Sequence, residues 1–337
     1  MGYQRVIITE FGGPEVLKVI EEAALPEPGP GEVRIKVLAT SACFTDTMVR
    51  KGAYVEVKDK PPFSPGYDVV GVVDKLGAGV TRLKVGQRVA DLTVIGACTE
   101  YICLPESRLT PVPEGLDSAE AVSLILSYLT AYQMLHRSAK VQPGQRILVH
   151  GAGGAVGTAL LQLGKLLDLE MYGTASKSKQ ELVTGLGATH IDYRSEDFVR
   201  RLADDRVDAA FDAVSGDNFK RSFSVLKPGG TLVAYGFYDV AMGKASSSSV
   251  MFDFMRVSLL WNILPNGRSS TFYSITQMRK KQADWFNEDL TELFSLLAQG
   301  KIKPVIAERM PLAEAARAHA LIEQAAVKGR IVLMVNE

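Results

Sequence analysis

The spacing of hydrophobic and polar residues divides the chain into a strand-rich part and a part in which strands alternate with helices. Up to about residue 120, short apolar runs such as VRIKVLA (33–39) and VVGVVDKLG (69–77) are separated by turns such as PEPGPGE. Short apolar runs bounded by Gly and Pro are typical of β-strands. We therefore expect an irregular β-rich domain in this part of the chain.

The pattern changes near residue 118. The segment SAEAVSLILSYLTAYQML has helical spacing, with Ser118 as its expected N-cap. From 146 to about 236, strand-like runs such as RILVHG and VDAAFDAVSG alternate with helical runs such as TALLQLGKLL. Strands that alternate with helices predict an α/β fold with a doubly wound parallel sheet. Mixed structure follows, and the apolar strand GRIVLMV comes last.

A glycine-rich turn in the segment Arg146–Gly157 (RILVHGAGGAVG) joins a strand to a helix. Glycines allow a tight turn and the close approach of a pyrophosphate, while the helix N-terminus supplies free N–H groups and partial positive charge. The spacing Gly151-x-x-Gly154-x-x-Gly157 departs from the common G-x-G-x-x-G, so a plain tight turn is the alternative. The strand–turn–helix context favours a nucleotide site, with contacts from Gly151, Gly154, Ala155, Val156 and Gly157.

The end of the next strand indicates which cofactor this site would hold. NAD-binding units place an Asp or Glu about 20 residues past the glycines, where it bonds the ribose 2′-hydroxyl. Here the strand ends in Ser176-Lys177-Ser178-Lys179, which contains no acid. Hydroxyl and ammonium groups accept a 2′-phosphate that a carboxylate would repel. The loop therefore favours NADPH over NADH, with a solvated basic loop as the alternative.

Charge and cysteine content narrow the function classes. The chain has 38 Lys+Arg and 38 Asp+Glu, so its formal net charge is zero, which argues against a general affinity for nucleic acid or membrane surfaces. No apolar run reaches the roughly 18 residues of a membrane span, and the first residues have no apolar signal core. Cys43, Cys98 and Cys103 form no C-x-x-C pair, which favours a reducing, cytoplasmic location.

The ordered motifs of the whole chain resemble the medium-chain dehydrogenase/reductase superfamily. The closest likeness is to its zinc-free quinone oxidoreductase branch, which includes zeta-crystallin and vesicle amine transport protein. The segments that carry the resemblance are FGGPEVLKV, PGPGEVRIKVLA, FTDTMVRKGAY, PFSPGYDVVGVVDKLGAGV, LTAYQML, HGAGGAVG, GTASKSK, IDYR, LKPGGTLVAYG and GKIKPVI.

This resemblance implies two domains with an active-site cleft at the carboxyl ends of the parallel strands. A GroES-like catalytic domain would comprise 1–121 and 264–337, and a Rossmann NADPH-binding domain 122–263. The residues that match cofactor contacts of the family are Ser176, Lys179 and Tyr193 for the 2′-phosphate, Thr130 near the nicotinamide, and Tyr235, Gly236 and Phe272 near the carboxamide. Lys177 competes with Lys179 for the phosphate.

The resemblance also bears on zinc. Zinc-dependent members carry Cys-His-Thr-Asp, then Gly-His-Glu, then a second cysteine. This chain has Cys43-Phe44-Thr45-Asp46 and Gly66-Tyr67-Asp68, so Tyr67 stands where a ligand histidine is expected. One thiol and one carboxylate do not complete a catalytic zinc site, so no metal is expected. We interpret Cys43 as a small buried thiol; the alternative is that it lines the substrate pocket.

Hydride transfer to an activated acceptor needs no metal. Quinones and α,β-unsaturated carbonyls accept hydride from a nicotinamide, and hydroxyl donors stabilise the charge that develops. Tyr54 and Tyr67 are the candidate proton donors, and aromatic packing under the cleft is the alternative for each. No G-x-S-x-G hydrolase motif is present, and the four histidines are scattered.

The apolar segment 254–264 (FMRVSLLWNIL) is interpreted as core or dimer interface, with substrate contact and membrane contact as alternatives. Members of the family join Rossmann sheets edge to edge, and the candidate edge here is 232–239 (LVAYGFYD). A homodimer is expected. The cluster Arg279-Lys280-Lys281 fits a solvated helix face better than an RNA site.

The function that these observations favour is an NADPH-dependent, zinc-independent oxidoreductase that reduces quinones or activated carbon–carbon double bonds, with a small-molecule substrate. The first alternative is an NADPH-binding structural or regulatory protein with incidental reductase activity. The second is a metal-dependent alcohol dehydrogenase.

Overall fold

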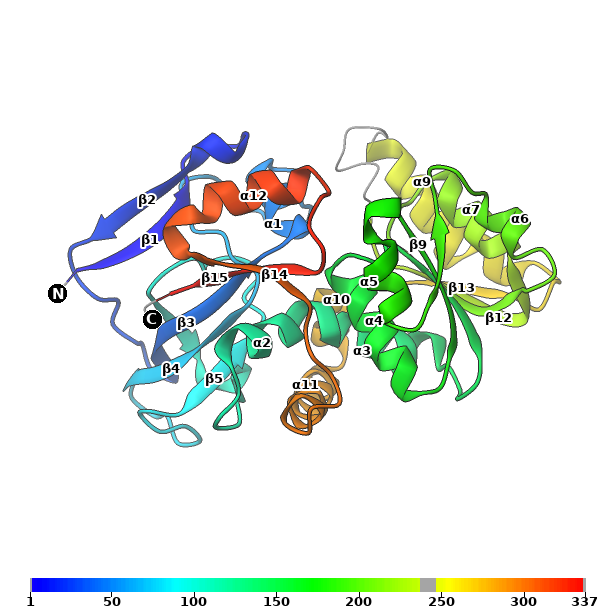
Figure 1. The fold of residues 1–337 in the computed structure, drawn as a ribbon. Coiled ribbons are helices and arrows are strands. Elements are labelled where there is room, and N and C mark those ends of the chain that lie inside the picture. Colours follow the sequence, from blue (N-terminus) through cyan, green and yellow to red (C-terminus); the bar gives the residue numbers. More distant parts are fainter. Residues whose placement is uncertain (1, 237–246, 336–337) are drawn as a thin grey trace. The chain divides into compact units, whose positions relative to one another are not determined.

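The computed structural model describes residues 2–236 and 247–335, with side chains from residue 252 onward in the second range. The chain divides into two compact units, Met1–Leu126 with Leu290–Glu337, and Ser127–Asp289. We call them the β-rich unit and the parallel-sheet unit, and their elements are labelled in Figure 1.

A seven-stranded sheet organises the β-rich unit. Its order is β14 (Ile306–Pro311), β15 (Arg330–Met334), β3 (Glu32–Ala42), β4 (Val69–Leu76), β5 (Arg88–Asp91) and β7 (Thr110–Pro111), with β6 (Tyr101–Pro105) paired to β3. A separate antiparallel pair is formed by β1 (Tyr3–Ile8) and β2 (Leu17–Glu22). The helices and helical turns are α1 (Phe44–Arg50), α2 (Ser118–Ser123), α12 (Ala315–Glu323), η1 (Pro14–Val16), η2 (Glu106–Arg108) and η7 (Leu312–Glu314).

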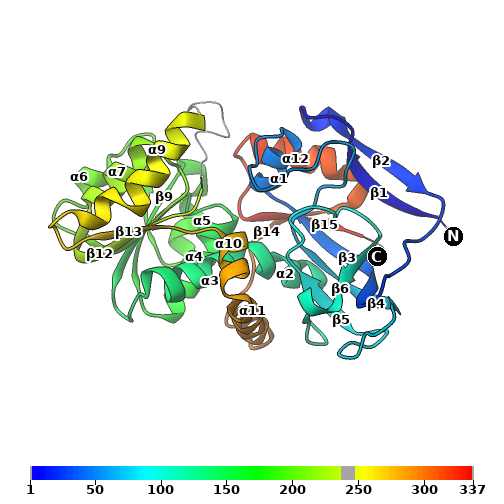
Figure 2. The same cartoon turned by 180° about the vertical axis from the view of Figure 1, so that it is seen from behind.

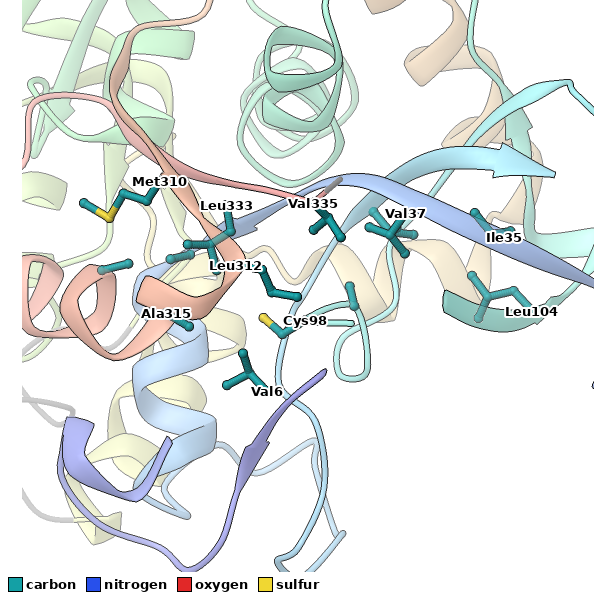
Figure 3. Packing of buried hydrophobic residues seen from close by; sticks show 14 of the residues in the cluster. Val6, Ile35, Val37, Cys98, Leu104, Met310, Leu312, Ala315, Leu333 and Val335 are labelled. Carbon is teal, nitrogen blue, oxygen red and sulfur yellow. The ribbon is translucent and has the colours of Figure 1, made fainter. Parts of the chain in front are cut away.

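The core of this unit follows from the alternation along β3. Val33, Ile35 and Val37 occur at every second position and are fully buried, as expected for a strand with one face on a core. Figure 3 shows Ile35 and Val37 among apolar side chains of the same cluster, which include Leu333 of β15 and Val335, just after that strand. The last strand thus completes a core that begins near the N-terminus.

The parallel-sheet unit contains six strands in the order β10 (Thr189–Asp192), β9 (Glu170–Ala175), β8 (Arg146–His150), β11 (Val207–Asp212), β12 (Leu226–Ala234) and β13 (Ser269–Phe272). Every neighbouring pair in this sheet is parallel. The order reverses between β8 and β11, so the predicted doubly wound sheet is confirmed, and its switch point lies at β8.

Helices cover both faces of this parallel sheet. In Figure 1, α4 (Ala155–Leu166) and α5 (Gln180–Gly185) lie in front of it. On the other face α6 (Phe198–Arg201), α7 (Asp217–Ser224) and α9 (Ser247–Ser258) share one hydrophobic cluster with η6 (Leu260–Ile263), and Figure 2 shows α9 from that side. The other helical elements are η3 (Leu124–Tyr128), α3 (Leu129–Gln133), η4 (Met134–Ala139), η5 (Lys177–Lys179), α10 (Ile275–Lys281) and α11 (Ala283–Ala298).

Three sequence expectations differ from this structure. The helix after residue 117 is capped by Asp117, whose side chain accepts the Glu120 N–H, so Ser118 is its first residue and not its N-cap. Residues 264–289 belong to the parallel-sheet unit and not to the β-rich one, because β13 pairs with β12. For the same reason β12 is paired on both sides and is not the sheet edge, and among the strands that the structure describes β13 lies at that edge. Residues 237–239 of the expected edge lie outside the described residues.

Candidate functional site

The glycine turn between β8 and α4 has the backbone geometry that an anion site needs. Gly151 has φ of +66°, a left-handed conformation that favours glycine. At Gly157, a Cβ would lie 2.3 Å from the Gly151 carbonyl oxygen, so the helix approaches the turn more closely than any side chain permits. Gly154 is the N-cap of α4 and provides no side-chain cap, which leaves the first N–H groups of the helix without a capping side chain.

Lys179 packs directly against this turn. A Cβ at Gly153 would lie 2.7 Å from Cδ of Lys179, so the lysine side chain runs across the glycine turn. Ser176 directly follows β9 as the N-cap of η5, and its hydroxyl lies 3.1 Å from the Ser178 hydroxyl. Because the loop holds hydroxyls and ammonium groups and no carboxylate, it can accept a phosphate. This packing singles out Lys179 over Lys177 as the lysine beside the turn.

Tyr193 follows the adjacent strand. β10 pairs with β9 so that Asp192 lies opposite Ala175, which places Tyr193 and Ser176 at the same edge of the sheet. Tyr193 is 57% exposed, and the Arg194 guanidinium lies 5.7 Å from the centroid of its ring. Ser176 and Tyr193 therefore follow the carboxyl ends of two neighbouring strands, and Lys179 follows Ser176 by three residues.

The residues expected near the nicotinamide divide into two groups. Tyr235, Gly236 and Phe272 lie at the carboxyl ends of β12 and β13, where the Tyr273 N–H donates to the Ala234 carbonyl at 2.7 Å. Thr130 is a buried residue of α3, and Gln133 of the same helix accepts a hydrogen bond at Oε1 from the Tyr273 hydroxyl at 2.8 Å. The bond between Gln133 and Tyr273 connects α3 to the residue that follows β13 within the parallel-sheet unit.

A buried polar network fixes the carboxyl ends of β8, β9 and β11. The His150 ring lies 2.9 Å from the hydroxyls of both Thr174 and Ser222, and Ser222 donates to Asp212 at 2.6 Å. Because the Ser222 hydroxyl donates its one hydrogen bond to Asp212, it must accept a hydrogen bond from Nε2 of His150. Nδ1 of His150 then accepts a hydrogen bond from the Thr174 hydroxyl. Burial lowers the pKa of His150, so the ring is neutral and holds the strands together.

The β-rich unit brings Tyr54 and Tyr67 together. Their hydroxyl oxygens lie 2.7 Å apart, and the Tyr54 hydroxyl lies 3.2 Å from Oε2 of Glu56. Tyr67 is 1% exposed, whereas Tyr54 and Glu56 are half-buried. Burial raises the pKa of both phenols, so both keep their protons and can act as hydrogen-bond donors.

Cys43 is the N-cap of α1 and lies near this pair. Its N–H donates to Oδ2 of Asp46 at 3.0 Å, its thiol is hydrogen-bonded to the same carboxylate, and Oδ1 of Asp46 accepts the Gly66 N–H. Burial raises the pKa of the Cys43 thiol and raises the pKa of Asp46 to about 6. A thiol that stays protonated is a weak nucleophile and a poor metal ligand, which fits the buried-thiol interpretation.

Sequence reasoning missed the buried ion pair between Asp68 and Arg330. The Asp68 carboxylate accepts the Ser41 N–H at 3.0 Å and pairs with the Arg330 guanidinium, and all three residues are buried. The partners are separated by most of the chain, so no local pattern could signal the pair. It connects the loop before β4 to the last strand.

Family models match both parts of the chain. The alcohol dehydrogenase GroES-like domain matches residues 29–114, and the zinc-binding dehydrogenase model matches residues 186–333. Two curated relatives span nearly all of it. The rat quinone oxidoreductase is 31% identical over 336 residues, covering 97% of this chain and 96% of the relative. The rat synaptic vesicle membrane protein VAT-1 homolog is 31% identical over 343 residues, covering 98% and 83%.

The chain belongs to the medium-chain dehydrogenase/reductase superfamily, together with the quinone oxidoreductases and VAT-1 homologs. Solved structures agree over the full length. The Escherichia coli quinone oxidoreductase complexed with NADPH has a TM-score of 0.85 at 28% identity, covering 98% of this chain and 99% of that one. The CurK enoyl reductase has a TM-score of 0.83 at 25% identity, covering 99% of each chain.

One of the matching family models is named for zinc binding, and the side chains at the corresponding ligand positions differ from those that hold a catalytic zinc. At the two positions that match zinc ligands, the chain offers the protonated thiol of Cys43 and the phenol of Tyr67, while the Asp68 carboxylate is already paired with Arg330. Among the described residues, no three His, Cys, Asp or Glu side chains are grouped closely enough to hold a metal. These residues do not fit a catalytic zinc, which needs three ligands.

The apolar segment 254–264 lies at the surface more than in the core. Val257 and Trp261 are buried, but Leu259 and Ile263 are 63% and 78% exposed. None of the helices in the described ranges combines the length and apolar character that crossing a bilayer requires.

Proposed function

We propose that this protein is an NADPH-dependent, zinc-independent oxidoreductase that transfers hydride to quinones or α,β-unsaturated carbonyls. The observation that carries the proposal is the packing of Lys179 across the glycine turn, next to Ser176 and in a loop without a carboxylate. This arrangement suits a 2′-phosphate and disfavours a cofactor that offers only a ribose hydroxyl. The NADPH complex of the E. coli relative supports the same cofactor.

NADPH, when bound, would supply the hydride for reduction of the acceptor. The pyrophosphate would be held by the N–H groups at the start of α4, and the 2′-phosphate by Ser176, Lys179 and Tyr193. In the β-rich unit, Tyr54 and Tyr67 would donate hydrogen bonds to the oxygen on which negative charge develops, and one of them would give the proton. Both phenols retain their protons because they are buried.

Turnover by metal-free protein tests the proposal. Oxidation of NADPH and NADH is followed in the presence of a chelator, with 1,4-benzoquinone, 9,10-phenanthrenequinone and a simple enal as acceptors. We expect NADPH-specific turnover of at least one acceptor at full rate. Loss of activity in chelator, restored by zinc, would instead identify a metal-dependent alcohol dehydrogenase.

The second candidate function is an NADPH-binding structural or regulatory protein. It is favoured by the replacement of the zinc-ligand histidine by Tyr67 and by the likeness to VAT-1, a protein named for the synaptic vesicle membrane. NADPH binding by fluorescence without turnover of any quinone or enal would favour this function over the first.

We propose further that the protein is a cytoplasmic homodimer. Among the described strands, β13 lies at the edge of the parallel sheet, and the neighbouring segment 254–264 exposes large apolar side chains, among them Phe254, Leu259 and Ile263. A second copy of the chain would cover both features. Sedimentation equilibrium measures the mass directly: twice the chain mass is expected, and the chain mass alone at micromolar concentration would reject the dimer.

A further inference from the structure

A hydrogen-bonded row of three side chains connects the surface of the β-rich unit to its interior. It runs from Glu56, which is half-buried, through Tyr54 to the fully buried Tyr67. We propose that Glu56 is the entry point for protons in this site and returns a proton to the tyrosine pair after each turnover. This inference rests on the proposed reductase function and adds to it a residue that no family motif in this sequence marks.

The row has a defined direction because each phenol has one proton. When Glu56 is ionised, the Tyr54 hydroxyl donates to the carboxylate at 3.2 Å, and therefore accepts from Tyr67 at 2.7 Å. In this state both phenolic protons point along the row toward Glu56. When Glu56 takes a proton from water, its carboxyl can donate to Tyr54 and Tyr54 to Tyr67, and the Tyr67 proton then becomes available. The row can thus reverse without any movement of heavy atoms.

Neighbouring ionisable groups have other hydrogen-bond partners. The Asp46 carboxylate is held by the N–H groups of Cys43 and Gly66 and by the Cys43 thiol. The Asp68 carboxylate is paired with Arg330. Glu56 is thus the carboxylate whose hydrogen bond leads to the tyrosine hydroxyls, and it is also more accessible to water than the fully buried Asp46 and Asp68.

The proton balance of the step is simple for an enal. Hydride addition at the β-carbon breaks the carbon–carbon π bond and leaves an enolate, which is a reduction by two electrons. The α-carbon forms its new C–H bond with a phenolic proton, and the O–H bond of that tyrosine breaks. The phenolate is protonated along the row, finally from the Glu56 carboxyl, and the carboxylate recovers its proton from water. Since protonation of carbon is slower than that of oxygen, an enal demands this relay more than a quinone does.

The test compares Glu56→Gln with a matched variant, Asp59→Asn, in the complete chain. Both substitutions remove one negative charge from the same exposed loop, but Asp59 has no place in the row. Turnover of an α-methyl enal with NADPH is measured in water and in D2O, together with the KM for each substrate. The stereochemistry of deuterium at the α-carbon reports whether a positioned donor delivers the proton.

For Glu56→Gln we expect kcat to fall about 10- to 100-fold, with a larger solvent isotope effect and unchanged KM values. Asp59→Asn should match the wild type. Glu56→Asp, which keeps a carboxyl group, should recover part of the rate, and acetate should partly rescue Glu56→Ala. Wild-type kcat and isotope effect in Glu56→Gln would overturn the relay and leave the reductase function standing. An absence of turnover in the wild type would overturn the reductase function itself, and the relay with it.

Discussion

The candidate sites of the two units differ in how deeply their polar groups are buried and in the charge that these groups carry. In the parallel-sheet unit, the candidate cofactor site consists of backbone donors at a helix N-terminus and of two half-buried side chains, Ser176 and Lys179, the latter across a glycine turn. In the β-rich unit, the candidate chemical site consists of the buried Cys43 and Tyr67 and the half-buried Tyr54, whose pKa values are raised by burial. The first environment suits a phosphate that is already charged, whereas the second suits a proton that must be kept until charge develops.

The largest effect should come from a change at the glycine turn. In Gly157→Ala the new Cβ would collide with the Gly151 carbonyl oxygen, at 2.3 Å, and with Cα of Ala152, at 2.6 Å. Because both are backbone atoms, the turn must shift, and we expect loss of measurable NADPH binding and about 1–3 kcal/mol of stability. Fluorescence titration and urea denaturation measure the two effects.

Gly185→Ala is the matched control for this variant. Gly185 ends α5, and no atom lies within 4 Å of its would-be Cβ. The added methyl should leave NADPH affinity unchanged and stabilise the helix by up to about 1 kcal/mol. Equal NADPH affinity in Gly157→Ala and Gly185→Ala would show that the turn does not hold the cofactor.

A moderate effect is expected from the phosphate loop. In the double variant Ser176→Ala/Lys179→Ala, loss of charge-assisted hydrogen bonds should weaken NADPH binding by about 1.5–3 kcal/mol, or roughly 10- to 100-fold, without changing NADH binding. Calorimetric titration with both cofactors measures the ratio. Lys177→Ala is the control and should keep the NADPH preference. Unchanged affinity of the double variant for both cofactors would reject the loop as the phosphate site.

The smallest effect concerns pH and the buried ionisable groups of the β-rich unit. Burial, aided by the adjacent Arg50, lowers the pKa of His319 from 6.5 to about 3. Between pH 6.5 and about 3, His319 is therefore protonated in the unfolded chain and neutral in the folded protein. The stability that the neutral His319 contributes is fully present above about pH 6.5 and is lost as the pH falls toward 3. Between pH 7 and 5, the wild type should lose about 2 kcal/mol more than His319→Gln, which cannot titrate.

Urea denaturation of both proteins at pH 7, 6 and 5 gives this difference. Arg50 and Glu323, which form an ion pair beside His319, are present in both proteins, so their own titration cancels. Parallel pH profiles for the wild type and His319→Gln would mean that His319 is not held neutral in the folded protein.

The sequence predicted those features that local patterns determine. Alternation along 33–39 and the strand–glycine–helix run at 146–166 identified β3, β8 and α4, because periodicity and turn chemistry act within a few residues. The edge strand β13 was missed because its residues, Ser269–Phe272, are mostly polar and gain their strand conformation from pairing with β12. Such pairing depends on tertiary structure and not on local propensity.

The candidate site was predictable to a similar extent. Ser176 and Lys179 stand in a motif, whereas the choice of Lys179 over Lys177 required the packing against Gly153. Tyr54 and Tyr67 were identified singly, but their hydrogen bond to each other and the role of Glu56 depend on side-chain positions. The Asp68–Arg330 pair lies beyond any local pattern because its members come from opposite ends of the chain.

In the mechanism proposed above, one unit binds the cofactor and the other supplies the proton. Single-turnover reduction of an enal by NADPH tests this division when the cofactor affinity is measured on the same samples. In Tyr67→Phe, we predict wild-type NADPH affinity and a rate at saturating cofactor that falls about 100-fold. In Ser176→Ala/Lys179→Ala, we predict weak affinity and a near wild-type rate at saturation. Affinity and rate that fall together in both variants would contradict the assignment of cofactor choice to one unit and proton supply to the other.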